Sequence, residues 1–68
     1  MEYLLIKFRE ARGVILNGSP SGTTNAVLEL EAGTYYVTLD RPYDFTPLTG
    51  VVRLKGTSVL APKEVEFA

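Results

Sequence analysis

The sequence predicts a small all-β domain, an antiparallel β-sandwich of six or seven short strands, with an open barrel as the alternative. Three observations predict it. Apolar and polar residues alternate in short runs, turn-forming residues separate these runs at intervals of about 8–12 residues, and no stretch has a helical period. We therefore expect one domain over residues 1–68 and no helix.

The clearest alternation covers residues 26–31 and 34–40. Successive side chains of a strand point to opposite faces, so the apolar residues of each run form a dry face. The dry face contains Leu28, Leu30, Tyr35, Val37 and Leu39. The sequence predicts a hairpin that turns at residues 31–34, with Glu29, Glu31 and Tyr36 on its wet face.

The remaining runs predict shorter strands. They cover residues 3–9, with Leu4, Ile6 and Phe8 on one face, and residues 14–16, 50–55, 59–60 and 65–67. Turns are expected at residues 10–13 and 56–58. Loops are expected at residues 17–25, which begin with an Asn-Gly pair suited to positive φ, and at residues 41–49, which contain Pro42 and Pro47.

Composition excludes several classes of protein. An apolar content of 46% argues against disorder, and a net charge of −1 provides no strong attraction to nucleic acid or to anionic membranes. The chain has neither cysteine nor histidine, so disulfides, thiolate metal sites and the commonest general base are absent. No apolar run approaches the roughly 20 residues of a membrane span. No export signal is visible, which implies a cytoplasmic location for a full-length chain and an extracytoplasmic one for a chain trimmed from a precursor.

The order of the elements resembles that of the PEGA domain, a small β-sandwich module. The first part of the resemblance is the strand and turn at residues 14–18, followed by Gly22-Thr23-Thr24-Asn25 where the family has Gly-x-Thr-Pro. The second part is residues 27–39, with Glu31 where the family has the proline of Pro-Ala-Gly, and residues 51–57 resemble its closing strand and turn. The resemblance implies a surface-associated binding or spacer domain, and it transfers no catalytic residue.

Several other groups suggest chemistry, and each has a simpler structural interpretation. Gly18 to Gly22 lacks the Lys-Ser/Thr of a phosphate-binding loop and is expected to form a turn. Asn17-Gly18-Ser19 matches a glycosylation acceptor only in form. Glu29 and Glu31 are expected to lie in water and to pair across strands with Lys7, Arg9 or Arg53. Asp40 and Asp44 are expected to make local turn bonds in preference to binding Ca²⁺.

A basic patch with tyrosines would form if the first strand and the strand at 50–55 were neighbours. Its members would be Lys7, Arg9, Arg12, Arg53 and Lys55, with Tyr3, Tyr36 and Tyr43 for stacking. This mixture is found in barrels that bind single-stranded nucleic acid. The net charge of −1 disfavours such a role for this chain.

The candidate partner-binding residues are Tyr36, Tyr43 and Phe45. The last two lie on the loop between Pro42 and Pro47, where an aromatic ring either caps the core or recognises a partner. We expect a non-enzymatic binding or spacer module for a protein or carbohydrate, with no catalytic residue, metal or cofactor. The alternative is a structural protein that forms weak homo-oligomers through edge strands, because a core this small is helped by association.

Overall fold

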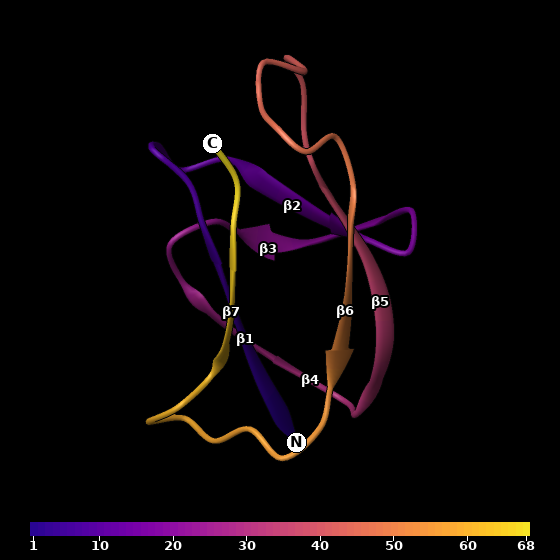
Figure 1. Cartoon of the computed structure of the whole chain (residues 1–68), viewed down its shortest axis with the longest axis vertical. Helices are drawn as coiled ribbons and strands as arrows, with labels where there is room; N and C mark the ends of the chain where they lie inside the picture. Colours follow the sequence, from indigo (N-terminus) through magenta and orange to yellow (C-terminus); the bar gives the residue numbers. More distant parts are fainter.

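The computed structural model describes residues 1–68 as seven strands in two sheets that pack face to face (Figure 1). The strands are β1 (Glu2–Lys7), β2 (Gly13–Leu16), β3 (Ser19–Thr23), β4 (Val27–Leu30), β5 (Gly33–Leu39), β6 (Gly50–Leu54) and β7 (Lys63–Glu66). One sheet has the order β4-β1-β7 and the other has the order β3-β2-β5-β6. The prediction of an all-β sandwich is confirmed, and the sheets do not close into a barrel.

All strand pairs are antiparallel except one. β1 pairs with β7 in parallel, with Leu5 opposite Glu64 and Lys7 opposite Glu66. The three-stranded sheet is therefore mixed, because the chain crosses from the four-stranded sheet at β6 to the edge of the other sheet at β7, whereas the four-stranded sheet is antiparallel throughout.

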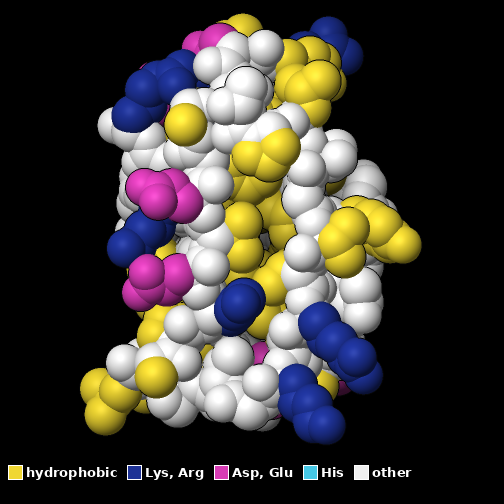
Figure 2. All heavy atoms as spheres, viewed as in Figure 1, with side chains coloured by type: hydrophobic (Ala, Val, Ile, Leu, Met, Phe, Trp, Pro, Cys, Tyr) yellow, Lys and Arg dark blue, Asp and Glu magenta, His cyan; other side chains and the backbone are white.

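The core lies between the two sheets and is built from the predicted dry faces. Its buried residues are Leu4, Ile6, Phe8, Val14, Leu16, Val37, Leu39, Phe45, Val52, Leu54 and Phe67. Leu28, Leu30, Tyr35 and Val65 pack against them. Every face assignment that followed from alternation in β1, β4 and β5 is thus confirmed. Hydrophobic side chains also reach the surface in the space between β7 and β6 (Figure 2).

The predicted hairpin at 26–40 is wrong, although its two strands exist. β4 pairs with β1, whereas β5 pairs with β2 and β6, so Glu31 and Ala32 cross from one sheet to the other. A type I′ hairpin turn needs positive φ at both central residues, and the only non-glycine residues with positive φ are Asn17 and Asn25. Alternation reports which face of a strand is buried and does not report which strand lies beside it.

The predicted loop at 17–25 is also partly wrong, because Ser19–Thr23 forms β3. Asn17 and Gly18 have φ values of 50° and 83°, the expected tight turn, and they return the chain beside β2. β3 is an exposed edge strand, where Pro20 is tolerated. It buries no side chain, so its sequence carries no hydrophobic pattern.

Two further details differ at the C-terminal end of the chain. Residues 59–60, predicted as a strand, belong to the irregular segment between β6 and β7, and their side chains are exposed. The strand predicted at 65–67 is confirmed as β7, which begins two residues earlier. No helix in the structure has the length and the apolar character needed to cross a membrane.

Candidate functional site

An exposed apolar cluster lies on the outer surface of the four-stranded sheet. Tyr36 and Val51 are opposite each other on β5 and β6, and their exposed fractions are 64% and 67%. Thr38 follows on the same face of β5, about 7 Å along the strand. The loop between β5 and β6 adds Tyr43 and Leu48, which are also well exposed. We call this surface the tyrosine face and define it by Tyr36, Thr38, Tyr43, Leu48 and Val51.

A shallow pocket lies where the loop meets the sheet. It has a volume of about 290 Å³ and is lined by Thr38, Tyr43, Leu48 and Thr49. The Thr38 hydroxyl donates to the carbonyl oxygen of Leu48 at 2.7 Å and holds this part of the loop against β5. The pocket is just below the usual size range for small-molecule sites, and it suits one side chain of a larger partner better than a whole ligand.

Phe45 lies in the core and is only 3% exposed. Its ring makes edge-to-face contacts with Phe8, Phe67 and Tyr43, with centroid distances of 6.1, 5.7 and 6.1 Å. Of the two interpretations of the loop aromatics, Phe45 therefore follows the core-capping one and presents no ring to a partner. Tyr43 and Tyr36 are exposed, and their role in partner binding remains a prediction.

A buried arginine holds the loop from below. The Arg12 side chain is 8% exposed, and its Nη1 donates to the carbonyl oxygens of Asp40 and Pro42 at 3.2 and 2.8 Å and to Oδ1 of Asp44 at 3.1 Å. Its Nη2 donates to Glu10 Oε2 at 2.9 Å. One side chain thus bonds alternate residues, 40, 42 and 44, at the start of the loop that carries Tyr43.

A second cation completes this cluster on the outside. Arg9 Nη2 lies 2.8 Å from Asp44 Oδ2, and the Arg9 guanidinium stacks over the Phe8 ring at 4.4 Å. The hydrogen bond from Arg12, followed by the positive charges of Arg12 and Arg9, lowers the pKa of Asp44 below its usual value. Asp44 is thus held as an anion, bonded to Arg12 and Arg9.

The far end of the loop is tied to the chain terminus. Thr46 and Ala68 exchange backbone hydrogen bonds of 2.8 and 2.9 Å, next to buried Phe45 and Phe67. The loop is therefore held by Arg12 at residues 40–44, by the buried ring of Phe45, by Ala68 at Thr46 and by Thr38 at Leu48. Binding through Tyr43 would require little further ordering of the backbone.

The predicted basic patch does not assemble. β1 and β6 belong to different sheets, so Lys7 is separated from Arg53 and Lys55. Arg9 and Arg12 are bound to Asp44 and Glu10, and Lys7 Nζ lies 3.0 Å from Glu64. The cations that sequence alone grouped for nucleic-acid binding are divided between two surfaces.

The acidic candidates are also placed differently from the prediction. Glu29 and Glu31 form no ion pair, because Lys7 and Arg9 pair with Glu64 and Asp44. Asp40 makes the expected local bond, accepting from the Arg41 amide at 2.9 Å. No group of three or more acidic, histidine or cysteine side chains is arranged to hold a metal ion.

The role of Arg12 could not be read from the sequence. The sequence predicts only a turn at residues 10–13, and the partners of Arg12, which are Asp40, Pro42 and Asp44, follow 28 to 32 residues later. The sequence offers only an indirect indication. The loop at residues 41–49 forms few ladder hydrogen bonds because of its prolines, so its backbone carbonyls need a donor from elsewhere in the chain.

Taken together, the two packed sheets, the short strands and the fixed aromatic loop define a small β-sandwich module. Residues 9–63 match the profile of the PEGA domain, which is most of the chain, so the chain belongs to the PEGA domain family. No curated protein and no solved structure matches it significantly. The match supports the general class of a small binding or spacer module.

Proposed function

We propose that this PEGA domain is a non-enzymatic binding module that docks a protein partner on the tyrosine face. The observation that carries the proposal is the exposure of Tyr36 and Tyr43 on a backbone that Arg12 and Phe45 hold rigidly. Exposed tyrosines on a fixed scaffold supply large contact areas at a low entropic cost, and they are enriched among the residues that dominate binding energy.

The chemistry of the other side chains supports a role without catalysis. Two carboxyl groups have displaced pKa values. Hydrogen bonds from Thr57 lower the pKa of Glu2, and the hydrogen bond from Arg12 lowers the pKa of Asp44. A general acid that works near neutral pH needs a raised pKa. Both groups are therefore suited to holding the fold together.

A protein partner fits the shape of the surface better than a carbohydrate does. The tyrosine face is an open sheet surface with one shallow pocket, whose Thr38 hydroxyl is already bonded to Leu48. The hydroxyls of Tyr43 and Thr49 are the side-chain groups that remain in the pocket to bond sugar hydroxyls, and no charged or amide side chain lines it. Apolar side chains such as Val51 and Leu48 extend the contact area that a protein can cover.

The test uses a phage-displayed peptide library and a glycan array as probes on the immobilised domain. We expect selected peptides to shift the amide resonances of β5, β6 and residues 41–49. Their affinity should fall about tenfold or more in Tyr36→Ser and Tyr43→Ser. Leu60→Ser is the matched control, because Leu60 is 94% exposed and lies outside the face. Peptides that map to another surface would refute the site, and binding only to glycans would refute the protein partner.

A further inference from the structure

The outer surfaces of the two sheets differ in charge. Alternation and the strand pairings decide which side chains lie on each. On the three-stranded sheet, the outward side chains of β4, β1 and β7 form what we call the acidic face. Its members are Tyr3, Leu5, Lys7, Val27, Glu29, Glu64 and Glu66.

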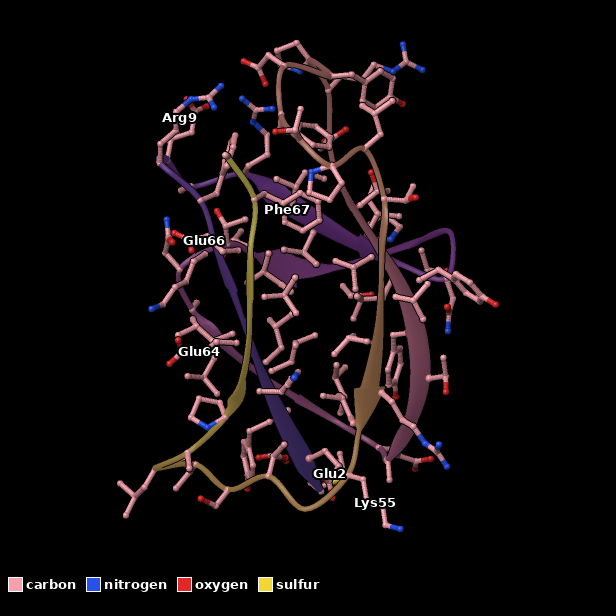
Figure 3. The ribbon with its side chains drawn as sticks, viewed as in Figure 1. Glu2, Arg9, Lys55, Glu64, Glu66 and Phe67 are labelled. Carbon is pink, nitrogen blue, oxygen red and sulfur yellow. The ribbon has the colours of Figure 1, made fainter.

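The acidic face has an apolar centre and a negative rim. Leu5 lies between Val27 and Glu64 in the sheet, and Tyr3 is opposite Glu29. The face carries three glutamates and one lysine, and that lysine is already paired with Glu64. Figure 3 shows Glu64 and Glu66 pointing away from the side of β7 on which Phe67 enters the core.

The tyrosine face has an apolar centre and a mainly positive rim. Arg53 follows Val51 on the outer side of β6, opposite Thr34, and Lys55 follows just beyond the strand. Neither cation forms an ion pair within the chain. β5 itself carries no acidic side chain, and Asp40 follows just beyond its end, next to Gly13. Figure 2 shows the anions of β7 on one flank of the molecule and cations at the lower end of the opposite flank.

These two faces are complementary to each other. We propose that the occupant of the tyrosine face is the acidic face of a second copy of this chain, a proposal that rests on the function proposed above. Pairing would place the unpaired Arg53 and Lys55 beside the glutamates of the next copy's acidic face, and it would cover the apolar centres around Tyr36 and Leu5.

The contact is heterologous, because each copy uses a different surface toward each neighbour. Such contacts continue from copy to copy unless a rotation closes them into a ring. The whole domain exposes 4292 Å², and an interface of standard size takes about 800 Å² from each partner. Two such contacts would remove more than a third of the surface of one copy, so we expect small interfaces and weak, salt-sensitive association.

The experiment uses sedimentation equilibrium from micromolar to millimolar protein. Val51→Asp damages the tyrosine face, and Val27→Asp places a charge on the acidic face beside Leu5, in its apolar part. Leu60→Asp is the control outside both faces. The wild type and Leu60→Asp should pass beyond a dimer as concentration rises, and high salt should reverse this. Each valine variant alone should stay monomeric.

A mixture of the two valine variants gives the decisive result. The intact acidic face of Val51→Asp can pair with the intact tyrosine face of Val27→Asp, while the two damaged faces repel. The mixture should therefore stop at a dimer. Association that both variants retain would indicate edge strands instead, and a monomeric mixture would overturn the proposal. Circular dichroism verifies that each variant folds. If Val51→Asp unfolds, Arg53→Ser replaces it as the variant of the tyrosine face, and if Val27→Asp unfolds, Glu66→Gln replaces it as the variant of the acidic face.

Failure of this pairing is distinguishable from failure of the proposed function. A wild type that remains monomeric at millimolar concentration, but binds selected peptides at Tyr36 and Tyr43, refutes only the second copy as partner. A wild type that does neither refutes both.

Discussion

The guanidinium of Arg12 donates to Oδ1 of Asp44 at 3.1 Å and so joins the turn after β1 to the loop after β5. The same guanidinium bonds two backbone carbonyls of that loop and Glu10. Because these bonds come from one rigid, planar group, the position of Tyr43 in the β5–β6 loop depends on a residue of the turn between β1 and β2.

The first prediction concerns acid. The pKa of Asp44 is lowered in the folded state, so its contribution to stability is complete above its ordinary pKa of about 3.9 and is lost as pH falls through the lowered value. The free energy of unfolding should therefore decrease below about pH 5. Urea denaturation at a series of pH values should show a shallower decrease in Asp44→Asn, together with lower stability at neutral pH.

Glu2 provides the matched variant for this measurement. Its pKa is also lowered, by hydrogen bonds from the Thr57 hydroxyl and amide, so Glu2→Gln should remove a separate part of the acid dependence. Glu2 lies at the opposite end of the molecule from the Arg12 cluster, so the two effects should add. An acid dependence that neither substitution reduces would contradict the assignment.

The second prediction concerns the shape of the donor at position 12. Lysine keeps the positive charge but cannot reproduce the forked contacts to Asp40, Pro42 and Glu10. In Arg12→Lys, the amides of Asp44 and Thr46 should exchange hydrogen about tenfold faster or more, while amides of the β1–β4 pair change little. Arg9→Lys is the control, because Arg9 contacts Asp44 from the exposed side. Equal effects of the two substitutions would show that charge alone holds the loop.

The third prediction separates the two aromatic residues of the loop. Phe45→Ala should lower the free energy of unfolding by about 3–5 kcal/mol, because the ring fills the core between Phe8 and Phe67. Tyr43→Ser should lower it by at most about 1 kcal/mol, since it loses one edge contact from an exposed site. Guanidinium denaturation measures both. A large loss in Tyr43→Ser would show that this ring serves the core.

The fourth prediction concerns Gly22 on β3. A Cβ at this position would overlap Cδ2 of Leu28, which packs across from β4, and the φ of 158° is also unusual for other residues. Gly22→Ala should lower stability by about 1–3 kcal/mol. Gly50→Ala is the control, because a Cβ there meets nothing within 4 Å, and it should be neutral or stabilising by up to about 1 kcal/mol. Equal midpoints of thermal unfolding for Gly22→Ala and Gly50→Ala would contradict the packing of Leu28 on Gly22.

Sequence predicted the faces of the strands well and their neighbours poorly. Leu28 and Val37 lie on the predicted dry faces because burial of alternate residues follows directly from the pleat. The same rule gives no information about pairing, so it predicts a hairpin turn at Glu31 and Ala32, where the chain in fact crosses between the sheets. No hydrophobic pattern predicts β3, because backbone pairing with β2, without burial of side chains, makes it a strand.

The candidate site was predicted in part for a similar reason. Tyr36 and Tyr43 are exposed where alternation and the proline-containing loop suggested, whereas Phe45 is buried. Arg12 could not be found, because its burial depends on carbonyl groups brought to it by folding. The exposure of a side chain that follows from its local pattern can be predicted from the sequence, whereas contacts between loops that are distant in the sequence cannot.

The parallel pairing of β1 and β7 has a mechanical consequence. These adjacent strands run in the same direction, and the two ends of the chain leave the molecule at opposite ends (Figure 1). Tension applied through the termini would pull β1 and β7 along each other and load their backbone hydrogen bonds together, in shear. An antiparallel pair pulled from one end would open bond by bond, so this arrangement gives the domain resistance to stretching when it is placed in series with other parts of a chain.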